Sequence, residues 1–181
     1  MPDVRVRARV GGRDVAMTVA DLVAEFFEAR GCRHAFGVVG AGNMRVFDAI
    51  ARRGYTHVIC THSEQAAAQA AIGYFRVRGQ IAPVLVTCGG GASNVVTGVV
   101  SAWMDSIPLF VVAGQESRRN HKLRAFGVQG FDLLDMLHRQ TKGRWMAEKG
   151  ACLQPAWDAM IYRRPGPVVI EIPMDVQGQQ V

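Results

Sequence analysis

The stretch Val84-Leu-Val-Thr-Cys-Gly-Gly-Gly91 joins a short apolar run to a glycine-rich turn. Residues 92–104 then follow a helical pattern, and a second apolar run occupies residues 109–113. Strands of a parallel sheet are buried on both faces, so their sequences are nearly continuous apolar runs linked by helices. This stretch therefore predicts a strand, a turn, a helix and a second, parallel strand.

The same alternation continues on both sides of this stretch. We predict strands at 35–39, 57–60 and 167–172, and helices at 18–30, after the turn 40–43, at 64–78, near Leu133 and near Ala156. Strands alternating with helices predict an α/β fold, here a single doubly wound domain with a mainly parallel central sheet and helices on both faces. We assign residues 17–177 to this domain, 1–16 to an N-terminal extension with a hairpin, and 178–181 to a tail.

Composition narrows the class of protein. The chain has 181 residues, of which 49% are hydrophobic and 20% charged, as in ordinary globular domains. No apolar run reaches the roughly 18 residues that a membrane-spanning helix needs, so we expect no membrane association. The four cysteines form no C-x-x-C pair and no secretory leader is recognisable, so we expect no metal site on this chain and a cytoplasmic location.

The formal net charge is +6, which raises the question of a nucleic-acid partner. The basic residues are dispersed, however, and no zinc-finger or RNP-like pattern accompanies them. We therefore expect no nucleic-acid binding. An anionic small molecule or an acidic protein surface accounts for this charge equally well.

One motif suggests a dinucleotide-binding domain. Gly40-Ala41-Gly42 follows a predicted strand and opens a helix, and Glu64 lies about 20 residues further on, as in the dinucleotide fingerprint. The fingerprint fails at its third glycine, where Arg45 stands and would prevent close packing of helix and strand. An oxidoreductase domain is therefore the less favoured alternative.

A more specific resemblance rests on several segments in order along the chain. These segments are Phe36–Asn43, Thr61–Tyr74, Thr87–Asn94, Ala102–Gln115 and Arg164–Gln177. Together they resemble the N-terminal pyrimidine-binding domain of thiamine diphosphate-dependent enzymes, in the group of acetolactate synthase and benzoylformate decarboxylase. The resemblance covers residues 17–177, and a set of five ordered motifs is far more specific than one glycine turn.

The resemblance implies a role for Glu64 as the catalytic residue that activates the cofactor. The glutamate at this position binds N1′ of the aminopyrimidine ring, which promotes loss of the thiazolium C2 proton. By itself, an acidic residue in the first turn of a helix would be explained by the helix dipole. The resemblance also implies further cofactor-binding residues, which are Gly89, Gly90, Gly91 and Asn94.

Substrate-binding residues are implied at three further places. The first is the loop Gly40, Ala41, Gly42 and Asn43, and the second is Gln115 at the end of a predicted strand. The third is the basic loop 117–124, in which Arg118 and Arg119 are expected to clamp a carboxylate or phosphate group.

The resemblance also implies a partner. Related enzymes hold the diphosphate and Mg²⁺ on a second domain marked by Gly-Asp-Gly, a sequence that is absent from this chain. We therefore expect the pyrimidine-domain subunit of a split enzyme, in a hetero-oligomer, most simply a heterotetramer, whose partner holds most of the cofactor. Its substrate would be a small 2-oxo acid, with decarboxylation and acyloin-type carboligation both open. A non-catalytic regulatory subunit is the alternative.

Overall fold

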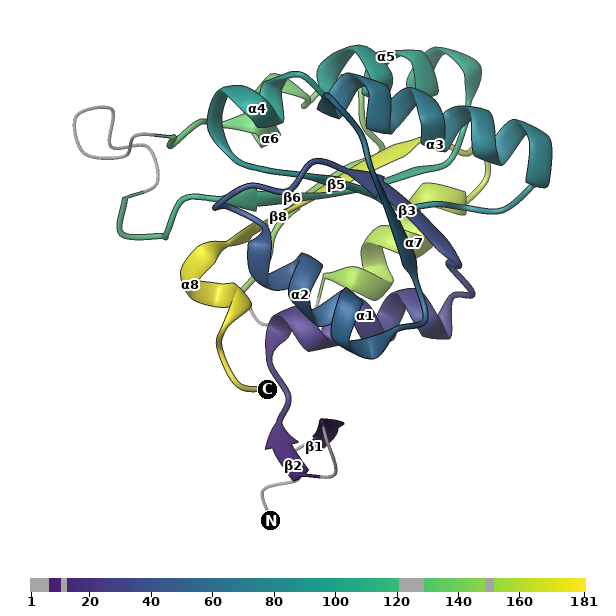
Figure 1. Cartoon of the computed structure of the whole chain (residues 1–181). Coiled ribbons are helices and arrows are strands. Elements are labelled where there is room, and N and C mark those ends of the chain that lie inside the picture. Colours follow the sequence, from purple (N-terminus) through teal and green to yellow (C-terminus); the bar gives the residue numbers. More distant parts are fainter. Residues whose placement is uncertain (1–6, 11–12, 121–128, 149–151) are drawn as a thin grey trace.

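A six-stranded parallel sheet forms the centre of the computed structural model, which describes residues 7–10, 13–120, 129–148 and 152–181 (Figure 1). Its strand order is β4-β3-β5-β6-β8-β7, and every neighbouring pair is parallel. The strands are β3 (His34–Gly37), β4 (His57–Cys60), β5 (Val84–Val86), β6 (Leu109–Gln115), β7 (Gly143–Met146) and β8 (Pro167–Pro173). The predicted doubly wound α/β class is confirmed.

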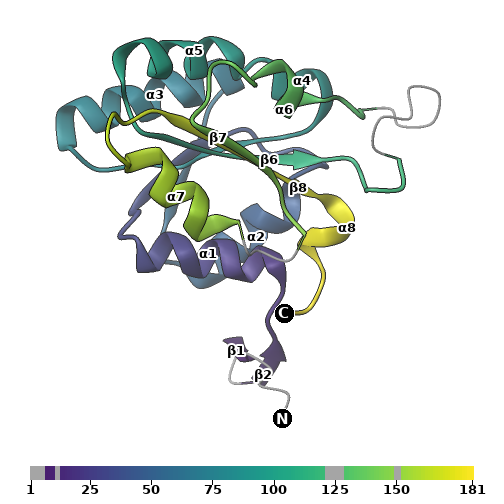
Figure 2. The same cartoon turned by 180° about the vertical axis from the view of Figure 1, so that it is seen from behind.

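Helices cover both faces of this sheet (Figures 1 and 2). One layer contains α3 (Glu64–Arg78), α4 (Gly89–Ser93), α5 (Val96–Asp105) and α6 (Leu133–Met136). The other contains α1 (Val19–Ala29), α2 (Met44–Arg53), α7 (Leu153–Ile161) and α8 (Met174–Gln177). Among the described residues, no helix is long and apolar enough to span a bilayer.

Each central strand supplies side chains to two cores because successive residues point to opposite faces. In β6, Phe110 and Val112 pack against α1 and α7, whereas Val111 and Ala113 pack under α3 and α5. Every residue of β6 is buried, which explains the apolar run over residues 109–113.

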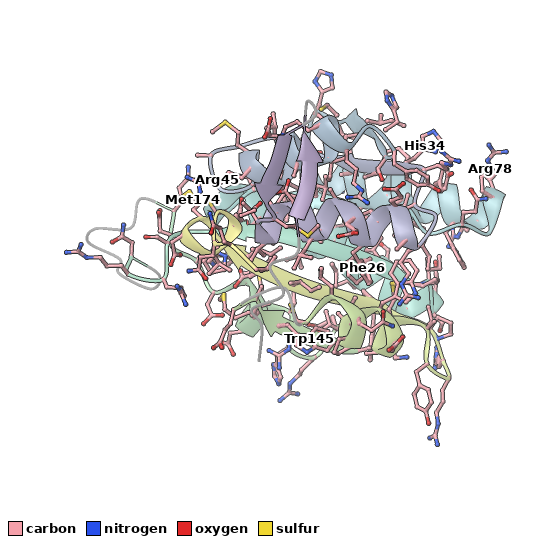
Figure 3. The ribbon with its side chains drawn as sticks, turned by 90° about the horizontal axis from the view of Figure 1, so that it is seen from below. Phe26, His34, Arg45, Arg78, Trp145 and Met174 are labelled. Carbon is pink, nitrogen blue, oxygen red and sulfur yellow. The ribbon has the colours of Figure 1, made fainter. Side chains whose placement is uncertain are left out.

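An aromatic cluster joins α1, α7 and the sheet. The Phe26 ring, labelled in Figure 3, stacks on Phe110 at a centroid distance of 5.9 Å and meets Trp157 edge-on at 5.8 Å. Arg30 lies over both the Phe26 and Trp157 rings. Such pairs add a specific orientation to the burial of apolar area.

The C-terminal end of the chain and the first described strands lie on the α1 side of the molecule (Figure 1). The strands β1 (Arg7–Val10) and β2 (Arg13–Ala16) pair antiparallel. Residues 178–181 are bonded to the domain. Val181 N donates a hydrogen bond to Met17 O, and Gln180 forms an antiparallel β-bridge with Thr18. The last residues therefore fasten the start of α1.

One local prediction is wrong, and one strand was not predicted. The helix predicted over 92–104 is divided, with α4 beginning in the glycine turn itself and α5 beginning at Val96. The division follows from i→i+3 bonds, in which Asn94 N donates to Gly91 O and Val95 N to Ala92 O. The strand β7 was not predicted, because its four residues, GRWM, show no alternation of apolar and polar residues.

Thr18 caps α1 through a reciprocal pair of hydrogen bonds. Asp21 N donates to Thr18 Oγ1 over 3.2 Å, and Thr18 N donates to Asp21 Oδ2 over 2.9 Å. Burial alone would raise the pKa of Asp21, but the bonds from Thr18 and the charge of Arg52 outweigh it and lower the pKa below 3.8. Asp21 therefore stabilises the fold at pH values above 3.8, and this contribution is lost as the pH falls through its lowered pKa.

The variant Thr18→Ala is expected to lower the free energy of unfolding by about 1 kcal/mol, because the first turn loses its side-chain acceptor. Urea denaturation at pH 7 measures this loss. Thr97→Ala, at an exposed position on α5, serves as the control and should change the value by less than about 0.5 kcal/mol. Equal effects of the two substitutions would contradict a capping role.

Candidate active site

The loops that follow β3 and β5 and the last residues of β6 touch one another at the carboxyl edge of the sheet. A Cβ atom added to Gly40 would lie 2.2 Å from Thr87 Oγ1, and one added to Gly114 would lie 2.1 Å from the Gly42 carbonyl oxygen. Gly114 therefore contacts the backbone of Gly42, and Gly40 contacts the side chain of Thr87. Neither glycine has room for a side chain. Ligands of open α/β sheets collect at this edge.

Glu64 stands at the first position of α3, beside these loops. Its side chain is buried, with 5% of the residue exposed. Asn94 Nδ2 donates to Glu64 Oε2 over 3.2 Å, and a Cβ atom on Gly91 would lie 2.9 Å from Glu64 Oε1. Ser63 Oγ caps the helix by accepting a hydrogen bond from Ala66 N. This cap places Glu64 at the first position of α3. The structure thus brings together three of the predicted cofactor-binding residues.

The other two glycines of this set differ in exposure. Gly89 is buried, and a Cβ atom there would lie 2.8 Å from Gln129 Cβ. Gly90 is exposed, and its carbonyl accepts a hydrogen bond from Ser93 Oγ over 2.7 Å. The backbone of Gly90 is therefore exposed at this edge and that of Gly91 is half-buried beside Glu64, whereas Gly89 is packed against Gln129.

The residues of loop 40–43 also differ in exposure. Gly40 is half-buried and Ala41 exposed, whereas Gly42 and Asn43 are buried. Asn43 Nδ2 donates to Val38 O over 3.0 Å, and Asn43 Oδ1 accepts from Gly40 N over 2.9 Å. Asn43 therefore holds the turn closed, and Gly40 and Ala41 are the members that a ligand can reach.

Gln115 ends β6, as predicted, but its amide group is fully engaged within the domain. Its Nε2 donates to Phe131 O over 2.7 Å and to Glu171 Oε1 over 2.9 Å, and its Oε1 accepts from Glu116 N over 2.8 Å. Only 1% of the residue is exposed. In this structure Gln115 positions the strand ends and does not reach the surface.

The two arginines of the basic loop have different surroundings. Arg118 Nε pairs with Asp175 Oδ2 at 2.9 Å, and Arg118 N donates to Asp175 Oδ1 at 3.0 Å. Arg119 is exposed and has no ion pair with any described residue. The remaining basic residues of the loop, His121, Lys122 and Arg124, lie outside the described residues. Arg119 is therefore the more accessible cation.

Three polar residues at this edge were not predicted. Gln177 Nε2 donates to Gly42 O over 2.6 Å and to Ile172 O over 2.8 Å, which ties the end of β8 to loop 40–43. Cys88 Sγ donates to Gln129 Oε1 over 2.9 Å, and burial raises the pKa of this thiol. Glu171 is fully buried in β8. Nothing in the local sequence marks these residues, because their partners are distant along the chain.

The described residues contain no group of three or more His, Cys, Asp or Glu side chains that could hold a metal ion. The residues around Glu64 offer one carboxylate, one carboxamide and exposed glycine backbone, a set suited to a polar heterocycle. They do not fit Mg²⁺ or a diphosphate group, which require several oxygen ligands or cations.

A family model described as the N-terminal TPP-binding domain of thiamine pyrophosphate enzymes matches residues 17–143. The chain belongs to this family. The resemblance read from the five motifs is confirmed, and the thiamine pyrophosphate family is favoured over the dinucleotide-binding alternative.

Known relatives are acetolactate synthases. The chain is 37% identical over 165 residues to acetolactate synthase isozyme 2 large subunit of Escherichia coli (strain K12), covering 89% of this chain and 30% of that protein. It is 34% identical over 160 residues to the large subunit of Haemophilus influenzae, covering 86% and 28% respectively. A probable large subunit of Methanocaldococcus jannaschii is 32% identical over 169 residues. The chain thus spans less than a third of these relatives' length.

Proposed function

We propose that this chain is the pyrimidine-binding part of a thiamine diphosphate-dependent enzyme that acts on a 2-oxo acid. The observation that carries the proposal is the buried carboxylate of Glu64, held on one oxygen by Asn94 and bordered on the other by Gly91. Because the chain belongs to the thiamine pyrophosphate enzyme family, we interpret this carboxylate as the group that contacts the cofactor.

Thiamine diphosphate, when bound, supplies a carbon nucleophile that adds to a carbonyl group and takes up the electron pair released on decarboxylation. Glu64 Oε1 would hold a proton shared with the aminopyrimidine ring, since Oε2 already accepts from Asn94. Burial of the carboxylate strengthens such a hydrogen bond by excluding water. The backbone of Gly90 and Gly91 would let the ring approach closely.

The diphosphate and Mg²⁺ would be held elsewhere, because the described residues offer no group that fits them. We place these ligands on a diphosphate-binding domain carried by a separate polypeptide, in a hetero-oligomer such as a heterotetramer. The extent of the match supports a second domain, since about 70% of each acetolactate synthase relative has no counterpart in these 181 residues. The cytoplasm remains the expected compartment.

The substrate would meet Gly40 and Ala41, with Arg119 as the cation for its carboxylate. Similarity to acetolactate synthases favours carboligation, in which a second carbonyl compound is attacked. A basic loop also suits simple decarboxylation of a 2-oxo acid with a second anionic group.

Purification of the tagged chain from its native host tests the proposal. We expect a polypeptide with Gly-Asp-Gly to co-purify, and the complex to release CO₂ from pyruvate or another 2-oxo acid once thiamine diphosphate and Mg²⁺ are added. Product analysis separates an aldehyde from an acyloin. Recovery of the chain alone, with no thiamine diphosphate binding by calorimetry, would instead support a non-catalytic subunit.

A further inference from the structure

A cavity lies at the opposite end of the sheet from Glu64. Its volume is about 430 Å³, and it is lined by Trp103, Met104, Lys142, Arg164 and Pro165. These residues come from the end of α5, the approach to β7 and the loop between α7 and β8. That loop lies at the end of the molecule away from α8 (Figure 2). The volume falls within the range of about 300–1,000 Å³ that is usual for small-molecule sites.

The cavity has two cations whose charges no described carboxylate neutralises. Lys142 Nζ donates to the Tyr162 carbonyl oxygen, and Arg164 Nε donates to Ser106 Oγ over 2.6 Å. Asp105, which directly follows Met104 in the sequence, is paired with Arg76. Partial burial lowers the pKa of Lys142, and an anion bound beside it would offset this effect.

The apolar wall of the cavity is unusually exposed for side chains of this size. Trp103 is 39% and Met104 70% exposed. A Cβ atom on Gly166 would lie 3.1 Å from Lys142 Cγ and 3.8 Å from Trp103 Cε3, so the lysine stem and the indole ring converge there. A flat ring can stack on an exposed tryptophan while its charged group reaches a nearby cation.

The backbone around the cavity is held in an uncommon conformation. Ser106 and Arg163 have φ values of 56° and 54°, and they are the only non-glycine residues with positive φ in the described part of the chain. Ser106 supplies the hydroxyl that orients Arg164, and Arg163 directly precedes it. The left-handed conformation of Ser106 is that of the C-cap of α5, and it brings the Ser106 hydroxyl within reach of Arg164 Nε.

We propose that this cavity binds a phosphate monoester that carries a planar ring, of the nucleoside monophosphate class. The ring would lie against Trp103 and Met104, and the phosphate would be bound by Lys142 and Arg164. Arginine binds phosphate through two parallel N–H bonds, and lysine contributes a point charge. The site is independent of Glu64 and of the chemistry proposed there.

Titration calorimetry with AMP tests the proposal on the full chain. We expect a dissociation constant of about 1 mM or lower, with adenosine and inorganic phosphate each binding at least about tenfold more weakly. Quenching of tryptophan fluorescence by AMP should disappear in Trp103→Leu, while Trp145 and Trp157 remain.

Arg164→Gln and Lys142→Gln are each expected to weaken AMP binding by about tenfold or more, because each removes a charge-assisted hydrogen bond. Arg78→Gln is the matched control, since Arg78 is exposed on α3, outside the cavity lining, and carries the same charge (Figure 3). Thermal melting verifies that each variant is folded. Absence of AMP binding, binding unchanged in both cavity variants, or equal weakening in the control would overturn the proposal.

Discussion

Glu64→Gln is expected to lower cofactor-dependent turnover by at least about 100-fold, because glutamine cannot hold the shared proton as a carboxylate does. The amide has nearly the same size and can still accept the bond from Asn94 Nδ2. The fold should therefore survive, with a nearly unchanged melting temperature. CO₂ release by the complex with its partner measures the turnover, and circular dichroism measures the melting.

The matched control is Glu148→Gln, which makes the same chemical change at an exposed carboxylate near the end of β7. Turnover by this variant should equal that of the wild type. If Glu64→Gln also retains wild-type turnover, Glu64 has no part in the mechanism. If it fails to fold, Glu64 is a structural residue of the α3 terminus.

Gly114→Ala is expected to lower the free energy of unfolding by about 3 kcal/mol, the upper part of the range for overpacked sites. The added Cβ atom would lie 2.1 Å from Gly42 O and 2.3 Å from Gly42 C, both of which are backbone atoms. Neither partner can move easily, because β6 is paired with strands on both sides and Gln177 Nε2 holds the Gly42 carbonyl. Urea denaturation measures the effect.

Gly73→Ala provides the comparison for this substitution. Gly73 lies in the middle of α3, and a Cβ atom there would have nothing within 4 Å. Alanine is the better helix former, so this variant should be more stable than the wild type by about 0.5–1 kcal/mol. A change of less than about 0.5 kcal/mol in Gly114→Ala would show that the loops separate without strain.

Elements with local signals at both ends could be predicted from the sequence. The helix α3 runs from Glu64 to Arg78, the range that we predicted, with Ser63 as its N-cap and Gly79 as its C-cap. The strand β4 occupies residues 57–60, which is the range that we predicted. The short strand β7 could not be found in this way, because its place beside β8 is decided by pairing with a distant strand.

Exposure of the candidate site residues could not be predicted, because it depends on distant contacts. Gln115 and Arg118 have the residue types expected for substrate binding, yet each is engaged within the domain. Their partners, such as Glu171 and Asp175, lie more than 50 positions away from Gln115 and Arg118 along the chain.

The sequence by itself determined the family and the α/β class, and it singled out Glu64 as the residue expected to activate the cofactor. These follow from ordered motifs and from local periodicity, which are properties of neighbouring residues. Only the tertiary structure decided that Asn94 and Gly91 flank this carboxylate, that Arg118 is paired, and that Lys142, Arg164 and Trp103 share a cavity. Parallel pairing brings the ends of separate strands to one edge, so such groupings depend on the whole sheet and not on any one segment.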